Sequence, residues 1–435
     1  MKAQTIFAGA VFTVARLFCG WAAAQDFDRE PINYESATPD NLISQLQKKI
    51  DAGQKKLPFS GHFGYLSAVL QELDVPVSSQ MLVYSKTSLQ RHRITPRTPR
   101  ALYFNDAVSV GFCQDGDVLE IAAVDSQLGT VFYTLNQDEV EQPHFRRHTD
   151  NCLICHASSQ TQQIPGHTLR SVFTDDDGQP VLSLGTTRVN QTTPLQKRWG
   201  GWYVTGTHGT QTHLGNLIVN ARDNREPIDN AAGQNVTDLK KRIEIDRFLT
   251  GHSDIVALLV LEHQAEALNL LTRASFQTRE ALHHEAQLNK QLGEPADHRW
   301  ESTTSRLKSV AEPLVKYFLF SQEAPLTGKV VGTSLFAVEF PQRGPRDSQG
   351  RSLRDLDLER RTFKYPCSYL IYSPVFDALP DEIRNDLLRR LWNVLSGADQ
   401  SADFAHLSPC DREAILEILR ETKANLPDYW KATTR

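Results

Sequence analysis

Five short apolar segments lie between residues 81 and 135, and turn-forming residues separate them. The segments are residues 81–84, 101–104, 108–113, 118–124 and 130–135. Three of the connections, Asn105-Asp106, Asp115-Gly116-Asp117 and Gln127-Leu128-Gly129, have the length and composition of β-hairpin turns. Because a hairpin joins neighbouring strands in opposite directions, we predict an antiparallel sheet in this part of the chain.

The pattern changes twice after this sheet. A second group of strand-like segments runs from residue 169 to 219, and after residue 236 apolar residues recur every three or four positions, as in helices. The predicted helices cover residues 239–250, 253–292, 300–320, 380–395 and 409–425, with a Gly-, Pro- and Arg-rich loop over 325–366. The predicted fold class is α+β, with an antiparallel β-rich region followed by a mainly α-helical C-terminal half.

These patterns also predict how the chain is organised. We expect a signal peptide over residues 1–24, a helical N-terminal segment over 25–79, a β-rich domain over 80–235 and a mainly helical domain over 236–435. Of the 435 residues, 40% are hydrophobic and 23% charged, as in ordinary folded proteins. The net charge of −5 gives no overall attraction to nucleic acid or anionic lipid, so we expect no nucleic-acid partner.

The first 24 residues have the composition of a secretory signal peptide. Lys2 precedes the apolar stretch Thr5–Ala15, and the small residues Ala22-Ala23-Ala24 precede Gln25. Arg16 interrupts the apolar stretch, which argues against a retained membrane anchor. We therefore predict export with cleavage, a periplasmic or otherwise extracytoplasmic location, and no integral membrane span in the mature chain.

Two cysteines and a histidine form a compact motif between the two strand groups, Asn151-Cys152-Leu153-Ile154-Cys155-His156-Ala157. A Cys-x-x-Cys-His sequence is the attachment site of c-type haem, because two thiols add to two vinyl groups while the next side chain reaches the iron. Cys152 and Cys155 are the predicted thioether residues, and His156 is the predicted axial ligand. With six Cys and 14 His in 435 residues, a random chain would contain roughly 0.003 such motifs.

Other uses of the cysteine pair need residues that the sequence does not place nearby. A zinc site would need two further ligands, and Cys367 and Cys410 do not form a second close pair. A thioredoxin-like redox pair would need a surrounding βαβ unit, and a plain disulfide remains as the third alternative. Residues 151–157 resemble the haem-binding motif of c-type cytochromes, which implies one covalent haem c in the β-rich region. The likeness covers this segment alone, and the rest of the chain is unlike a small class I cytochrome.

The second axial position of the iron is the main open question. The chain contains two Met, Met1 and Met81, and neither follows the motif. The sixth ligand is therefore a histidine, a water or another side chain, and we favour His213 in a Gly-rich loop. The remaining candidates are His208, His167 and His263, or an open position. A histidine there would give a lower reduction potential than methionine does.

Two further features bear on the haem prediction. The run from Arg91 to Arg100 holds four arginines, of which Arg97 or Arg100 are candidates to bind the haem propionates. A solvated loop or a docking patch for an acidic partner would have the same composition. Cys113, Cys367 and Cys410 either form one disulfide and one free thiol or stay as three thiols.

The predicted function follows from the motif and the signal peptide. We expect an exported monohaem c-type cytochrome-like protein that transfers electrons to a redox partner protein. The chain is longer than a simple carrier requires, which motivates an alternative as a haem oxidoreductase acting on peroxide or another small molecule. A haem-based sensor or scaffold, using the helical half for interaction, is the third alternative.

Overall fold

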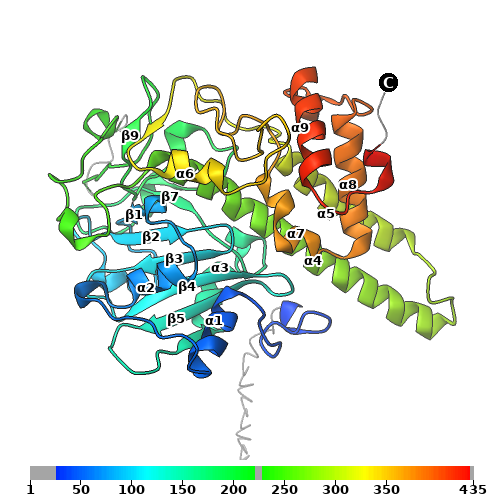
Figure 1. Cartoon of the computed structure of the whole chain (residues 1–435), viewed down its shortest axis with the longest axis horizontal. Coiled ribbons are helices and arrows are strands. Elements are labelled where there is room, and N and C mark those ends of the chain that lie inside the picture. The colour runs from blue at the N-terminus through cyan, green and yellow to red at the C-terminus, as the bar shows by residue number, and fades with distance from the viewer. Residues whose placement is uncertain (1–25, 221–227, 432–435) are drawn as a thin grey trace, which may run out of the picture.

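The computed structural model describes residues 26–220 and 228–431, so the expected signal peptide over residues 1–24 lies outside the described residues. One six-stranded sheet organises the N-terminal half (Figure 1). Its strands are β1 (Met81–Val83), β2 (Arg100–Phe104), β3 (Val108–Phe112), β4 (Val118–Asp125), β5 (Gly129–Asn136) and β6 (Phe145–His148). Every strand pairs antiparallel with the next one along the chain. The predicted antiparallel sheet is confirmed.

The hairpin turns form where the sequence predicted them. Between β2 and β3, Oδ1 of Asn105 accepts hydrogen bonds from the backbone N–H groups of Ala107 and Val108, at 3.0 and 2.9 Å. Between β4 and β5, Oδ1 of Asp125 accepts from the N–H groups of Gln127 and Leu128 in the same way. Short polar side chains at these positions satisfy backbone donors that a turn would otherwise leave exposed.

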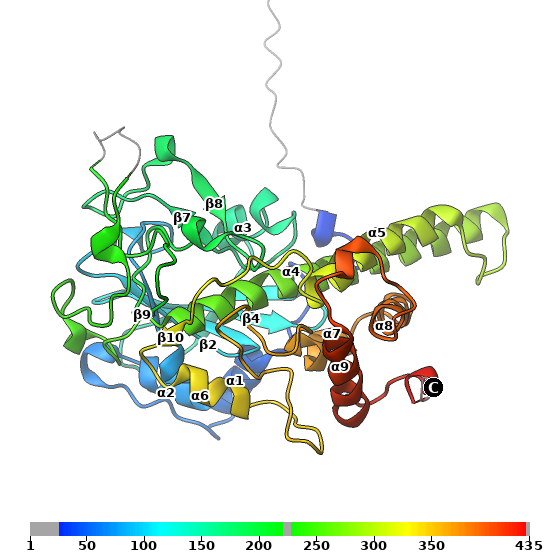
Figure 2. The same cartoon turned by 90° about the horizontal axis from the view of Figure 1, so that it is seen from above.

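Each face of the sheet packs against a different set of elements. Figure 2 shows α1 (Leu42–Asp51) and α2 (Leu66–Glu72) on one side, and α4 (Ile255–Leu292) with α3 (Asn151–His156) on the other. We call the second side the α4 face. The register aligns Leu102, Gly111, Glu120 and Thr134 across four strands on this face. Along β4 its residues are only partly buried, whereas the residues on the opposite face are fully buried.

Helix α4 is the central element of the helical half. It begins after Asp254, whose side chain accepts hydrogen bonds from the N–H groups of Val256 and Ala257, and it ends at Gly293 in a left-handed conformation (φ 73°). The helix has 38 residues and is long and apolar enough to cross a membrane, but its most apolar window is 100% buried within the protein. Such burial is expected of a core helix.

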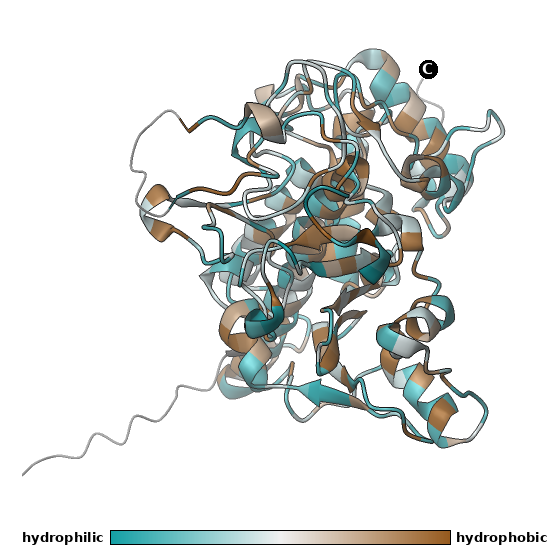
Figure 3. Cartoon of the chain, turned by 90° about the vertical axis from the view of Figure 1, so that its left-hand side faces the viewer, coloured by the Kyte–Doolittle hydropathy of each residue, from teal (hydrophilic) through white to brown (hydrophobic). Residues whose placement is uncertain are grey.

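Shorter helices pack around α4 and complete the C-terminal half. They are α5 (Glu301–Phe318), α6 (Phe336–Gln342), α7 (Pro374–Asp377), α8 (Asp381–Leu395) and α9 (Pro409–Thr422). Figure 3 shows hydrophobic and hydrophilic residues close together along the helical ribbons. In α8 the buried residues recur every three or four positions, as in an amphipathic helix that buries one face. The predicted α+β class, with helices concentrated in the C-terminal half, is therefore confirmed.

Some predicted elements are absent or different in the described chain. The second strand group contains only the short strands β7 (Arg170–Val172), β8 (Thr186–Arg188) and β9 (Gly206–Thr207), which pairs with β10 (Val331–Gly332). The predicted helix over 239–250 contains only the 3-10 turn Ile245–Arg247. Residues 199–204 do not form a strand, because Trp199 and Gly201 adopt positive φ angles of 70° and 81°.

One hydrophobic core joins the sheet to the helical half. Met81 and Phe104 of the α4 face belong to the same buried cluster as residues of α4, α5 and α8. A second cluster fills the space between the opposite face of the sheet and helices α1 and α2. Because the first cluster includes residues from both sides of residue 236, the predicted boundary does not separate two cores, and the division into four parts stays a prediction.

Candidate functional site

Helix α3 carries the Cys-x-x-Cys-His motif. Its six residues include Cys152 and Cys155, which are three positions apart and so lie on the same side of one helical turn. Leu153 is buried and anchors the helix, whereas Ile154 is 72% exposed. Both motif cysteines are free thiols, with Cys152 partly buried and Cys155 exposed. The helix therefore places the exposed Cys155 beside the partly buried Cys152 and His156.

A hydrogen bond fixes the orientation of His156. Its Nδ1 lies 2.9 Å from the backbone carbonyl oxygen of Gly166. A carbonyl only accepts, so Nδ1 carries the proton and Nε2 keeps the lone pair that a metal needs. Metal-binding histidines in general donate their second N–H in this way, which fixes the ring orientation and raises the basicity of the ligand. The sequence predicted His156 as a ligand, and the structure gives it the required tautomer.

Electrostatics around the motif favour neutral side chains. Burial lowers the pKa of His156, and the charge of Arg100 lowers it further, so the imidazole is unprotonated near neutral pH. Burial raises the pKa of the Cys152 thiol to about 11, with the carboxylates of Glu120 and Asp150 adding to the effect. Neutral imidazole is the form that ligates iron.

The motif lies over the α4 face of the sheet. The ring of His156 packs against that of Phe132 in β5, with centroids 4.7 Å apart. Two residues further along β5, Thr134 pairs in register with Glu120 of β4, so Phe132 and Glu120 are on the same face. This part of the face is incompletely covered along β4. On this face the side chains of β4 are therefore partly exposed, whereas Phe132 and Thr134 of β5 are buried.

The two arginines predicted as candidates for propionate binding, Arg97 and Arg100, differ in their surroundings. Arg100 in β2 forms an ion pair of 2.5 Å with Glu120, and its charge acts on His156. Its Nε is buried and receives no hydrogen-bond partner within residues 26–220 and 228–431. Arg97 is exposed, and its charge acts on Tyr203. Of the two candidate arginines, Arg100 is the one with a buried donor that forms no hydrogen bond within the described residues.

His167 lies near His156, close enough that, beyond the effect of burial, the charge of His156 lowers the pKa of His167. It directly follows Gly166, whose carbonyl accepts the Nδ1 proton of His156. Nδ1 and Nε2 point in different directions from the imidazole ring. The Gly166–His167 peptide therefore lies on the Nδ1 side of His156, and Nε2 points away from it. The Nε2 of His167 itself is buried and forms no hydrogen bond within the described residues, and His167 stays a candidate for the sixth ligand.

His208 and His213 form a buried pair elsewhere. Their ring centroids are 4.7 Å apart, and the ring of His213 also packs against Trp199. Nδ1 of His213 accepts a hydrogen bond of 3.0 Å from the N–H of Gly215, so in the neutral ring the proton is on Nε2. Iron binding at Nε2 would require the proton to move to Nδ1, which already faces the N–H donor of Gly215. His213 stays a prediction as the sixth ligand, and it needs a local rearrangement.

His263 is held on both sides of its ring. Its Nδ1 lies 2.6 Å from Oε1 of Gln191, and its Nε2 lies 2.8 Å from the hydroxyl of Ser368. The ring stacks against Tyr317 and Phe320 in the core. Burial lowers the pKa of His263 to about 3. These contacts indicate a structural histidine.

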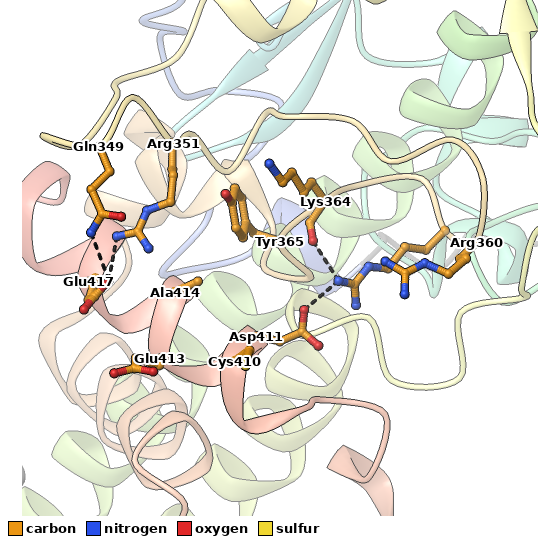
Figure 4. A pocket seen from close by; sticks show the side chains of 11 residues that line it. Gln349, Arg351, Arg360, Lys364, Tyr365, Cys410, Asp411, Glu413, Ala414 and Glu417 are labelled. Carbon is orange, nitrogen blue, oxygen red and sulfur yellow. Dashed lines mark hydrogen bonds and ion pairs between the residues drawn. The ribbon is translucent and has the colours of Figure 1, made fainter.

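The other cysteines and a cavity beside α9 lie apart from the motif. Cys113 and Cys367 are buried, Cys410 is exposed, and all three are free thiols. A cavity of about 570 Å³ lies between the loop over 349–365 and helix α9 (Figure 4). Charged side chains across it are paired, Arg351 with Glu417 at 2.7 Å and Arg361 with Asp411 at 2.6 Å. Its lining residues include no histidine and none from α3.

Sequence reasoning missed the residues that support His156. Gly166 is within a Pro-Gly pair ten residues after the histidine, and this turn signal was visible. Asn269 interrupts an apolar run of α4 and contacts the same peptide, but nothing in the sequence connects positions that are 102 residues apart. In the described part of the chain, no group of three or more His, Cys, Asp or Glu side chains is arranged to hold a bare metal ion.

Comparison with known proteins adds no assignment. No protein-family model matches the chain, and neither does any curated protein or solved structure.

Proposed function

We propose that this protein is an exported monohaem c-type cytochrome-like protein that transfers electrons to a redox partner protein. One haem c would be bound covalently through Cys152 and Cys155, with His156 as an axial ligand. The observation that carries the proposal is the hydrogen bond from Nδ1 of His156 to the carbonyl of Gly166 at 2.9 Å, within a Cys-x-x-Cys-His motif. It gives the histidine the tautomer and the fixed orientation of a metal ligand.

The surroundings of the motif fit a haem. The two thiols are free and on one side of α3, as attachment to two vinyl groups requires. On the same face of the sheet the side chains of β4 are partly exposed, and a haem held by α3 would contact them. The buried Nε of Arg100 has no partner among the described residues and is a suitable donor for a propionate. The haem supplies the one-electron chemistry, and the chain supplies the ligand, the attachment and the local charge.

Export is part of the proposal. Covalent attachment of haem c in bacteria takes place outside the cytoplasm, and the composition of residues 1–24 is that of a cleaved signal peptide. We therefore propose a periplasmic or otherwise extracytoplasmic location. The partner would be a redox protein, because single-electron transfer needs a donor or an acceptor.

A haem-stained denaturing gel tests the proposal directly. The full-length chain is produced together with haem-maturation machinery, and the stain reports only covalently bound haem. We expect the wild-type protein to stain and the double variant Cys152→Ser/Cys155→Ser not to stain. Cys410→Ser is the matched control, because Cys410 is also an exposed free thiol but lies outside the motif.

Each result decides the proposal. A stained wild type with an unstained double variant supports attachment at the motif. An unstained wild type that is folded and exported refutes it. Equal staining of the wild type and the double variant would place the haem at other residues.

A further inference from the structure

One side chain of α4 holds the peptide that orients His156. Asn269 is 2% exposed, and its Oδ1 accepts a hydrogen bond of 2.8 Å from the backbone N–H of His167. Its Nδ2 donates a second hydrogen bond of 2.8 Å to the carbonyl of His167. Asn269 therefore binds the donor and the acceptor of a single residue in the loop after the motif.

The first of these bonds acts on the same peptide group as His156 does. The carbonyl of Gly166 and the N–H of His167 belong to one planar unit. At one end of this unit the carbonyl accepts the Nδ1 proton of His156, and at the other end the N–H donates to Asn269. Hydrogen bonds in such a chain polarise one another, so the contact with Asn269 makes the carbonyl a stronger acceptor.

Two contacts fix the preceding peptide group, which joins Pro165 to Gly166. The N–H of Gly166 donates to the carbonyl of His156 at 2.8 Å, and the carbonyl of Pro165 accepts from the N–H of Thr130 at 3.3 Å. A Cβ on Gly166 would lie 2.3 Å from Oδ1 of Asn269, so only glycine leaves room for the asparagine. Residues 165–167 are thus held between α3, β5 and α4.

We infer that Asn269 is a positioning residue that sets the reduction potential of the haem by holding the acceptor of the His156 Nδ1 proton. This inference rests on the proposed function. A stronger acceptor makes the imidazole a more basic ligand, and a more basic ligand stabilises ferric over ferrous iron. Removing Asn269 weakens the acceptor, so the reduction potential rises.

The direct test is redox titration of the haem-bearing full-length protein. In Asn269→Ala, we expect the ratio of reduced to oxidised haem at a fixed potential to increase up to tenfold, which corresponds to a rise of 59 mV for one electron. Asn289→Ala is the matched control. Asn289 is also a buried asparagine of α4, 1% exposed, with one donated and one accepted hydrogen bond to residues 298 and 300. It is 20 positions further along the helix, about 30 Å by helical rise, so its loss should leave the potential unchanged.

A second variant reaches the same contact from the loop. In Gly166→Ala, the added methyl group displaces Asn269, so we expect a rise in potential as well. The double variant Gly166→Ala/Asn269→Ala should show less than the sum of the two single effects, because both substitutions break one contact. If Asn269→Ala yields no haem-bearing protein, Gly166→Ala alone decides the question.

The outcomes separate this inference from the proposed function. Absence of covalent haem in the folded wild type refutes the proposed function. Stained protein whose potential is the same in the wild type, Asn269→Ala and Gly166→Ala refutes only the role of Asn269. A shift in Asn289→Ala equal to that in Asn269→Ala would show a general loss of helix packing, and would also overturn the inference.

Discussion

Arg198 and Glu262 form an ion pair of 2.6 Å in the interior of the protein, where their side chains are 4% and 0% exposed. The carboxylate also accepts a hydrogen bond from the indole N–H of Trp199. Burial raises the pKa of Glu262 to about 7, although Arg198 and Trp199 act in the opposite direction. A buried charge pair of this kind costs stability when one partner is removed, because the other charge remains without a partner.

We expect Arg198→Met to lower the free energy of unfolding by about 3–5 kcal/mol near pH 8. The loss should be smaller near pH 5, because Glu262 without its cation takes up a proton. A carboxyl whose pKa is raised in the folded state binds more protons there than in the unfolded state. The contribution of Glu262 to stability therefore falls as pH rises from 4.5 to about 7. Urea denaturation at both pH values measures this. An equal loss at pH 5 and pH 8 would contradict the charge argument, and Arg360→Met, at an exposed ion pair, is the control.

A second prediction concerns the two arginines of the run before the motif. The charge of Arg100 acts on His156, and a positive charge near ferric iron favours reduction. We therefore expect Arg100→Leu to lower the reduction potential of the haem. Arg97→Leu removes an equal charge from an exposed position and should leave the potential near the wild-type value. Redox titration of both variants checks this, and equal potentials for the two would contradict it.

The sequence predicted the elements whose signals are local. The strands of the sheet follow from short apolar segments separated by turn residues, and hairpin turns such as the one at Asn105 follow from residues within four positions. Strand β6 was missed because Phe145–His148 is polar and is stabilised by pairing with β5, which no local pattern reports. Residues 199–204 lie within the strand-like group predicted over 169–219, but Trp199 adopts a positive φ of 70° and the segment forms no strand.

At the candidate site, too, the sequence predicted the local features and missed the long-range contacts. Cys152, Cys155 and His156 are adjacent in the sequence, and their spacing carries the chemical signal. The contacts that orient them are long-range, such as the bonds between Asn269 and His167, 102 positions apart. The proton position in His213 depends on the N–H of Gly215, a geometric detail that residue types do not contain.

The sixth ligand gives a third prediction, on which the sequence and the geometry differ. The sequence favoured His213, whereas the hydrogen bond from Gly215 places the proton of the neutral ring on Nε2. We expect His213→Ala to keep the absorption spectrum of the wild-type haem protein, because the ring packs with Trp199 and His208. If His213→Ala loses the low-spin spectrum and the alanine variants of His167, His208 and His263 keep it, His213 is the sixth ligand. Cyanide or peroxide binding to the wild type would then show whether the position is open.

A fourth prediction concerns the acid stability of the protein. Burial lowers the pKa of His263 and of His213 to about 3, and that of His167 to about 4. In the unfolded chain histidine titrates near 6.5, so between about pH 6.5 and pH 4 the unfolded state binds more protons than the folded state. Stability is fully present above pH 6.5 and is lost as pH falls through this window. Each such group adds up to about 1.4 kcal/mol per pH unit to the slope.

Substitution of His263 isolates one of these contributions. Glutamine retains hydrogen-bonding atoms for Gln191 and Ser368 but takes up no proton, so His263→Gln should reduce the slope of unfolding free energy against pH by up to about 1.4 kcal/mol per unit. The absolute stability of the variant also falls because the stacking on Phe320 is lost, but the slope is independent of that loss. His144→Gln, at an exposed position, is the control. A slope unchanged between pH 6 and pH 4.5 in His263→Gln would mean that His263 takes up its proton without unfolding.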